Sequence, residues 1–331
     1  MTVMTKIPPP SLDNPPTLHF MGDWGRANLH RVMGWLGYEL GRLAGPQFRF
    51  AIWNSTGGMD AARAVGRGEI DVAIMTPACC ARMPFEGTGF SADEAFPHLR
   101  ALGLVPQNDR LILAIRREHD IRSFADLRAK QPPLKIIAAR DDGTNPIGMM
   151  TQTFMHTAGI PRTTLESWGG RYLERDEPID CFRDMIAGRA DAIIMEAVMS
   201  EFWHNMARQV DLFYLPIEAA TKEQLQRTYG WTSATLPANY QPGLDVESEF
   251  LDFSDFILLT TTDLPDDVAY AMAWSLVERY EGLSRQYAHI PSERSPVNYP
   301  IDPKAACRTP IPLHPGAERY FREAGHLTKQ P

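Results

Sequence analysis

The sequence predicts an α/β protein built from two lobes, and three observations lead to this fold class. The chain has 331 residues, which is more than one small hydrophobic core requires. Short apolar runs alternate with amphipathic stretches, a pattern that indicates parallel βαβ units. A stretch that begins at Gly68 also has a counterpart that begins 120 residues later, at Gly188.

The first part of the chain alternates strands with helices. Apolar and β-branched residues predict strands over 18–21, 48–53 and 70–75. Apolar residues spaced three and four apart predict an amphipathic helix that ends at Gly45-Pro46; they are Leu29, Val32, Leu36, Leu40 and Leu43. The turn Ser55-Thr56-Gly57-Gly58 precedes a further helix over 60–65.

The middle part repeats this alternation. Strands are predicted over 111–115 and 135–139, with a short helix between them whose Ser123 and Asp126 resemble a capping box. A second helix runs through Ala158, with Asn145 as its N-cap and Pro146 in its first turn.

The last part begins with a strand over 253–260 and a helix that follows Asp263-Leu264-Pro265. Proline-rich, irregular chain is predicted over 291–315. Pro315-Gly316 then opens a final amphipathic helix that carries Ala317, Tyr320 and Phe321.

The internal counterpart supports two related halves. Both 68–75 and 188–195 follow a helix and consist of a glycine turn, an aspartate and a buried strand. Helix-to-strand connections can resemble one another by chance, or each lobe can share one βα register. In that register Thr76 and Glu196 lie just beyond the carboxyl ends of their strands, where open α/β sheets bind ligands.

Composition excludes several classes of function. A net charge of −8 argues against nucleic-acid binding, and no apolar run approaches the roughly 18 residues of a membrane helix. Four cysteines without a CxxC motif indicate reduced, mostly buried thiols. Metalloprotease, P-loop, dinucleotide-binding and GxSxG motifs do not occur, so we expect neither a cofactor nor a metal ion.

The N-terminal stretch 1–16 is proline-rich and has no apolar core of the kind that a secretory signal requires. We expect it to be a flexible lead. As written, the sequence predicts a cytoplasmic protein, or a periplasmic one if the true start or a leader is missing.

Four motifs in order resemble one known family. They are Ser55-Thr56-Gly57-Gly58, Gly68-Glu69-Ile70-Asp71, Asp263-Leu264-Pro265-Asp266 and the stretch 312–323, from Pro312 to Glu323. Together they are similar to the TAXI-type solute-binding subunits of TRAP transporters, from about Leu18 to the end of the chain. Asp141-Asp142, Glu196 and the absent leader depart from the family pattern.

The resemblance implies a type 2 periplasmic binding protein-like fold, with two α/β lobes and a ligand cleft between them. Lobe 1 would be discontinuous, combining 17–113 with 215–331, and lobe 2 would comprise 114–214. Domain closure would capture a small organic carboxylate, with or without an amino group or a ring. The partner would be a TRAP membrane permease if the protein is exported, with no direct membrane insertion.

The candidate ligand-binding residues lie in loops that follow predicted strands. Two facing helix starts, at 24–28 and at Asn145, would offer backbone N–H groups to a carboxylate. Asp142 and Glu196 fit this only if they face solvent or if the ligand brings a cation. Trp24, Trp53 and Tyr240 are either aromatic walls or ordinary packing residues. The full set is Asp23, Trp24, Arg26, Trp53, Ser55, Thr56, Thr76, Asp142, Gly143, Thr144, Asn145, Glu196 and Tyr240.

Two alternatives to a solute receptor remain at this stage. The first is a cytoplasmic enzyme on the same fold, a decarboxylase, dehydratase or isomerase of a carboxylated metabolite. Its acid or base groups would be Glu196, Asp142 or His30. The second is a cytoplasmic sensor or partner-docking protein in which closure is the signal. No nucleophile stands out in the sequence.

Overall fold

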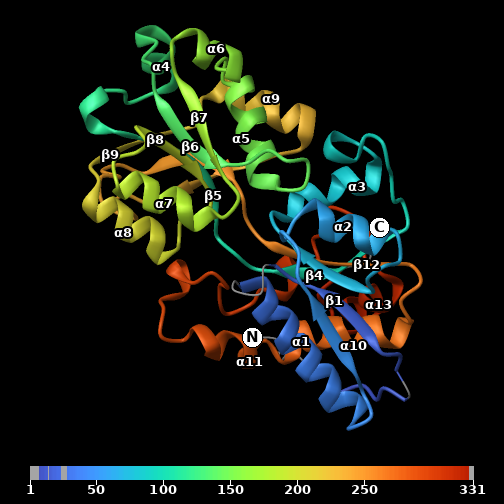
Figure 1. Ribbon diagram of the computed structural model, residues 1–331. Helices are drawn as coiled ribbons and strands as arrows, with labels where there is room; N and C mark the ends of the chain where they lie inside the picture. Colours follow the sequence, from blue (N-terminus) through green and yellow to red (C-terminus); the bar gives the residue numbers. More distant parts are fainter. Residues whose placement is uncertain (1–6, 14, 24–27, 328–331) are drawn as a thin grey trace. The chain divides into compact units, whose positions relative to one another are not determined.

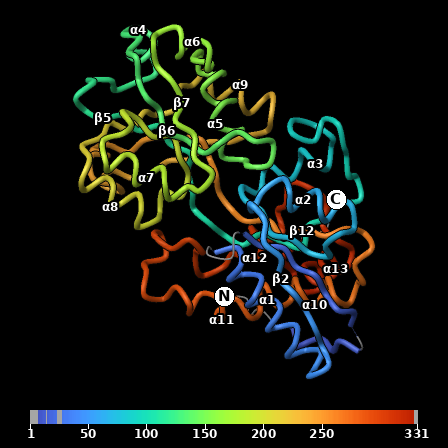
Figure 2. The backbone as a smooth tube through the Cα atoms, in the orientation of Figure 1, coloured from blue at the N-terminus to red at the C-terminus, as the bar shows by residue number. Residues whose placement is uncertain are grey.

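The computed structural model describes residues 7–13, 15–23 and 28–327 and divides the chain into two compact units. Unit 1 combines residues up to Asn108 with those from Ser254 onward, and unit 2 comprises Asp109–Phe253. Figure 2 shows the N-terminal (blue) and C-terminal (red) segments intertwined in unit 1, while the green and yellow middle of the chain forms unit 2. Within the described ranges, no helix is both long and apolar enough to cross a membrane.

Five described strands form the sheet of unit 1, in the order β2-β1-β3-β12-β4. β1, β2 and β3 run parallel, and β12 is antiparallel to both β3 and β4. The strands are β1 (Leu18–Met21), β2 (Phe50–Trp53), β3 (Val72–Met75), β4 (Leu99–Val105) and β12 (Phe256–Thr261). The helices are α1 (Asn28–Ala44), α2 (Met59–Gly66), α3 (Arg82–Glu86), α10 (Asp266–Glu278), α11 (Tyr280–Ser284), α12 (Pro303–Ala306) and α13 (Pro315–Glu323).

The predicted strands and helices of unit 1 are confirmed, with shorter strands at 50–53 and 72–75. The α1 face that carries Leu29, Val32 and Leu36 packs into one apolar core with α10, α13 and the sheet. Figure 1 shows α1 and α10 side by side. The irregular stretch 291–315 contains the short helix α12.

The described part of the proline-rich lead packs on unit 1 instead of extending freely. Leu12 is 3% exposed and belongs to the core, and the Trp274 indole donates a hydrogen bond to the Ile7 carbonyl at 3.0 Å. The apolar side chains of Ile7 and Leu12 account for this packing, because their burial offsets the entropy of ordering the segment.

Unit 2 holds a sheet in the order β10-β11-β5-β8-β6-β7, with β9 also paired to β5. The strands are β5 (Arg110–Arg116), β6 (Lys135–Ala139), β7 (Arg171–Arg175), β8 (Ala192–Met195), β9 (Leu212–Leu215), β10 (Ser233–Leu236) and β11 (Ser248–Asp252). The helices are α4 (Phe124–Lys130), α5 (Pro146–Thr157), α6 (Arg162–Ser167), α7 (Pro178–Ile186), α8 (Glu201–Gln209) and α9 (Ala219–Tyr229). Figure 1 shows α7 and α8 on one side of this sheet and α5, α6 and α9 on the other.

The division of the chain differs from the predicted lobes. Unit 2 begins at Asp109 and extends to Phe253, so it includes 215–253, which the sequence assigned to lobe 1. The physical reason is strand pairing. β11 lies antiparallel to β5, with Leu251 opposite Leu111, and β10 pairs with β11.

Candidate functional site

In unit 1, polar residues gather where three neighbouring parallel strands end. Asp23 follows β1, Ser55 and Thr56 follow β2, and Thr76 follows β3. Backbone hydrogen bonds join these loops: Ser55 N–H donates to the Asp23 carbonyl at 3.1 Å, and Thr76 N–H to the Gly57 carbonyl at 3.2 Å. The structure therefore brings four of the predicted binding residues together at one sheet edge, the edge that binds ligands in open α/β sheets.

Asp23 already occupies the start of α1. Its side chain is buried, and its carboxylate accepts the Leu29 N–H at 3.0 Å and the His30 N–H at 3.4 Å. The His30 imidazole lies 3.5 Å from the same carboxylate. These two donors of α1 are therefore already bound by Asp23, whereas the stretch 24–28 that was predicted to hold an anion lies, apart from Asn28, outside the described residues. Trp24 and Arg26 lie outside the described residues.

The loop after β2 is closed by its own hydrogen bonds. Asp60 accepts the Thr56 N–H at 2.8 Å and the Thr56 hydroxyl at 2.6 Å, while the Ser55 hydroxyl accepts the Gly57 N–H at 2.9 Å. Gly57 has φ +74° and packs so tightly that a β-carbon there would lie 2.6 Å from Leu29. The Ser-Thr-Gly turn thus fixes the loop shape and adds a second carboxylate, Asp60, to this edge.

In unit 2, the loop after β6 carries the second group of predicted residues. Asp142 accepts three hydrogen bonds, from the Thr144 N–H at 2.9 Å, the Thr144 hydroxyl at 2.8 Å and the Asn145 N–H at 3.0 Å. Asn145 caps α5 by accepting the Ile147 N–H at 2.9 Å. Burial works to raise the pKa of Asp142, but the hydrogen bonds from Thr144 and Asn145 outweigh it and lower that pKa. The prediction that Asn145 is the N-cap of α5 is confirmed. The carboxylate of Asp142 already lies at the start of this helix.

Glu196 follows β8, the strand next to β6, so it lies at the same edge of the sheet as this loop. It is half-buried, and its carboxyl group hydrogen-bonds to the carboxyl group of Asp109, which is buried. Burial, together with the adjacent negative charge of Asp109, raises the pKa of Glu196 well above its usual range. Glu196 therefore carries a proton at a pH where an exposed glutamate is ionised.

Asp109 and Gln241 hold the loop after β8 and were missed by the sequence analysis. The Asp109 carboxylate accepts the N–H groups of Ala197 and Val198 at 2.9 and 3.0 Å. The buried Gln241 amide donates to the Val198 carbonyl at 2.5 Å, and its oxygen lies 3.3 Å from His204 Nδ1. In the sequence, Asp109 belongs to the polar run Gln107-Asn108-Asp109, and nothing in such a run indicates that the Asp109 side chain is buried.

The two remaining aromatic candidates differ in their exposure to solvent. Trp53 is 52% exposed and turns back along the sheet, where its indole stacks on His19 and donates to His19 Nδ1 at 3.1 Å. Tyr240 is only 5% exposed within unit 2. The Trp53 ring thus packs on His19 and the Tyr240 ring is buried, and a role of either ring in solute binding stays a prediction.

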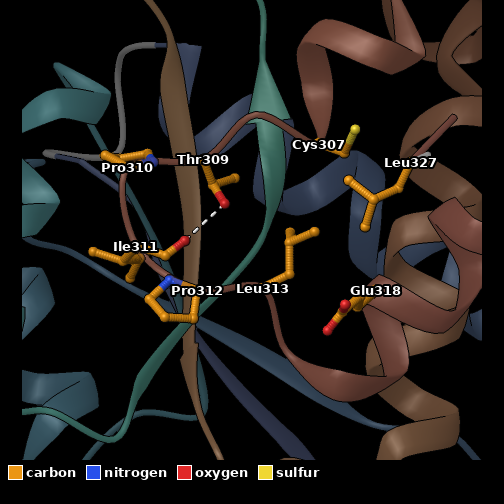
Figure 3. Close-up of a pocket in the computed structure, with 8 residues that line it drawn as sticks. All are labelled: Cys307, Thr309, Pro310, Ile311, Pro312, Leu313, Glu318 and Leu327. Carbon is orange, nitrogen blue, oxygen red and sulfur yellow. Dashed lines mark hydrogen bonds between the residues drawn. The ribbon is translucent and has the colours of Figure 1, made fainter. Parts of the chain in front are cut away.

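A cavity of about 470 Å³ lies in unit 1, beside the chain that leads into α13 (Figure 3). Apolar residues such as Ile311 and Leu313 line it, together with Cys307 and Glu318, and the Thr309 hydroxyl donates to the Ile311 carbonyl at 2.8 Å. It contains none of the predicted binding residues. Among the residues that the structure describes, no group of three or more His, Cys, Asp or Glu side chains could hold a metal ion.

The two sheets, with polar loops at the carboxyl ends of their parallel strands, define a protein of the type 2 periplasmic binding protein fold. The chain belongs to the NMT1-like family, whose model matches residues 36–325. It has no significant match among curated protein sequences. The two-lobe α/β fold class is therefore confirmed.

Three solved structures share the fold at low sequence identity. PhnD1 from Prochlorococcus marinus in complex with methylphosphonate is 11% identical with a TM-score of 0.55, and the match covers 95% of this chain and 100% of that one. Rpa4515 from R. palustris with adipate is 12% identical with a TM-score of 0.51, covering 93% and 92%. XAC2383 from Xanthomonas citri bound to ATP is 11% identical with a TM-score of 0.50, covering 94% and 99%.

Proposed function

We propose that this protein binds a small organic solute reversibly, by closure of its two units, with strand-end loops of both units contributing to the site. The observation that carries this proposal is the repeated placement of polar residues. Asp23, Ser55 and Thr76 gather at the ends of parallel strands in unit 1, and Asp142 and Glu196 do so in unit 2. Solved relatives of the same fold were crystallised with small anionic ligands, which supports a solute of similar size.

The solute class that we favour is a small organic acid that also carries an amino group. Asp23 and Asp142 already accept the N–H donors at the starts of α1 and α5, so these helix ends are less able to neutralise a further anion. The loops around them also bring Asp60 close to the unit 1 edge. A cationic amino group offsets like-charge repulsion there.

A thermal-shift screen tests this proposal. Organic acids are compared in pairs that differ only by an amino group, because a ligand that binds the folded state raises the melting temperature. We expect the amino-bearing member of at least one pair to stabilise the protein more and to be recovered unchanged. If no acid of either kind stabilises it at millimolar concentration, the proposed function is wrong.

Thr144→Ala locates the site. Its hydroxyl donates to Asp142 at the start of α5, whereas the Thr157 hydroxyl donates to the Thr153 carbonyl at the end of the same helix, at 2.8 Å. We expect Thr144→Ala to weaken solute binding with little change in folding, and Thr157→Ala to leave binding unchanged. If both variants bind the solute with equal affinity, the start of α5 does not belong to the binding site.

The enzymatic alternative is kept because of one feature, the carboxyl group of Glu196 beside that of the buried Asp109. A carboxyl group with a raised pKa is suited to general acid catalysis. Product analysis of each stabilising acid separates the two functions: a solute returned unchanged supports binding, and turnover abolished by Glu196→Gln supports a lyase or isomerase.

A TAXI-type role with a TRAP permease as partner belongs to the same proposal and requires export to the periplasm. Fractionation of cells that express the native gene tests the location. Recovery in the periplasmic fraction supports the receptor role, and recovery in the cytoplasm alone favours the enzyme or the sensor.

A further inference from the structure

Asp109 stands where the chain enters unit 2, and it also contacts the point where the chain leaves. It is the first residue of the unit and is buried. Phe253, the last residue of the unit, donates its N–H to the Asp109 carbonyl at 3.1 Å. A contact that holds the Asp109 side chain in place therefore restrains both connecting segments, the one that enters unit 2 and the one that leaves it.

The Asp109 carboxylate connects this point to the loop after β8. It accepts the N–H groups of Ala197 and Val198, and also that of Arg110 at 2.6 Å. Ala197 has φ +61°, a left-handed conformation that L-residues adopt only when their surroundings enforce it. The hydrogen bonds that the Ala197 and Val198 N–H groups donate to Asp109 hold Ala197 in this conformation.

Glu196 completes the arrangement. Its carboxyl group hydrogen-bonds to that of Asp109, and two carboxyl groups can do so only when one of them carries a proton. Three backbone donors already face Asp109, which favours the charge on Asp109 and the proton on Glu196.

We propose that Asp109 and Glu196 form a one-proton latch, in which the shared proton fastens the loop 196–198 to the segment where the chain enters unit 2. Loss of that proton at higher pH places two negative charges side by side in a buried place and loosens the loop. The latch goes beyond the proposed function, because it operates whether or not a solute binds.

The direction of the pKa shift agrees with this geometry. Burial and the charge of Asp109 raise the pKa of Glu196, so the folded protein holds a proton that the unfolded chain releases. The resulting stabilisation is complete below about pH 4, the usual glutamate range, and is lost as the pH rises through the raised pKa.

Several other groups surround the pair. Arg110 directs its guanidinium to the Asp109 carbonyl and to Asp252, and the Cys181 thiol of α7 lies within electrostatic range of Glu196. The charged and titratable groups that lie near the pair are Arg110, Asp252 and Cys181, and the helix after this loop, α8, carries Glu201 and His204. The test compares variants that all retain His204.

Hydrogen exchange of the Ala197 and Val198 amides reads the latch directly, because these N–H groups are the ones that bind Asp109. After correction for intrinsic exchange, we expect wild-type protection to fall about tenfold for each pH unit above the pKa of the pair. In Glu196→Gln the amide donates to Asp109 without titrating, so protection should not change with pH. Glu201→Gln, an exposed glutamate of α8, is the matched control and should follow the wild type.

Equal pH dependence in the wild type and in Glu196→Gln would overturn the latch. A carbon-13 titration of the Glu196 carboxyl in the wild-type protein provides a second test that needs no variant. A midpoint well above that of exposed glutamates supports the latch, and a midpoint in the usual range refutes it, independently of any result on solute binding.

Discussion

Asp71 and Asp191 make the same two hydrogen bonds in the two units. Asp71 donates its N–H to the His19 carbonyl at 3.0 Å and accepts the His19 N–H at 2.6 Å, at the start of β1. Asp191 does the same with Lys135 at the start of β6, at 2.9 and 2.7 Å. Each aspartate thereby sets the register of a buried parallel strand pair.

The shared geometry predicts matched effects of mutation. Asp71→Ala and Asp191→Ala should each lower the free energy of unfolding by about 1–2 kcal/mol, because each leaves a strand N–H without its charged acceptor. Urea denaturation of the single and double variants measures this. The two losses should add, since the residues lie in separate compact units. If only one of the two variants loses stability, the two aspartates share their hydrogen-bond geometry but do not contribute equally to stability.

These aspartates also mark how far sequence can predict this fold. The Gly-x-x-Asp pattern and the strand after it are local, so residues 68–75 and 188–195 could be paired by inspection. The cap at Asn145 and the apolar face of α1 were predictable for the same reason, because capping and helical spacing involve neighbours in sequence.

The remaining features depend on contacts between distant residues. Asp109 receives two of its three N–H donors from 88 and 89 residues away, and no local pattern indicates this. The pairing of β11 with β5 likewise reassigns a long segment to unit 2. Asp23 was predicted at the binding edge, but whether its carboxylate faced a ligand or the start of α1 depended on geometry that only the structure provides.

Gly148 sets the distance between α5 and the end of β6. A β-carbon at this position would lie 2.2 Å from the Arg140 carbonyl oxygen, a backbone atom that cannot easily move. Gly148→Ala should therefore destabilise the protein by about 1–3 kcal/mol or more. Gly34→Ala in α1 is the control: its nearest neighbour would be Ile52 at 3.8 Å, so a change of less than about 1 kcal/mol, in the stabilising direction, is expected. Thermal denaturation compares the two, and similar melting temperatures would contradict the close approach.

The four cysteines are free thiols, and their burial predicts unequal reactivity. Burial raises the pKa of Cys181 to about 12. A hydrogen bond with Cys79, together with burial, raises the pKa of Cys80, whereas Cys79 itself is half-buried. At pH 8 iodoacetamide should modify Cys181 on the order of a thousandfold more slowly than an exposed thiol, since the thiolate is the reactive species. Peptide mass spectrometry before and after denaturation measures this, and rapid native labelling of Cys181 would show that α7 opens readily.

Asp184 fastens α7 to the end of β7 and to the turn before β8. It is 5% exposed, and its carboxylate accepts hydrogen bonds from Arg175 and, at 2.8 Å, from Arg189. Burial alone would raise its pKa, but the two arginines outweigh that effect and lower it. Asp184→Asn should cost about 3 kcal/mol near pH 7, because it leaves two guanidinium groups without their charged partner.

The pH dependence distinguishes this role from simple packing. Because the folded-state pKa lies below that of the unfolded chain, the stabilisation is complete above about pH 4 and is lost as the pH falls through the lowered value. The difference between wild type and Asp184→Asn in urea denaturation should thus be constant from pH 6 to 8 and shrink below about pH 4. Asp180→Asn, which breaks an exposed pair with Arg183 on the same helix, should cost less than about 1 kcal/mol. A cost for Asp184→Asn that persists unchanged in acid would mean that shape, and not charge, holds α7 in place.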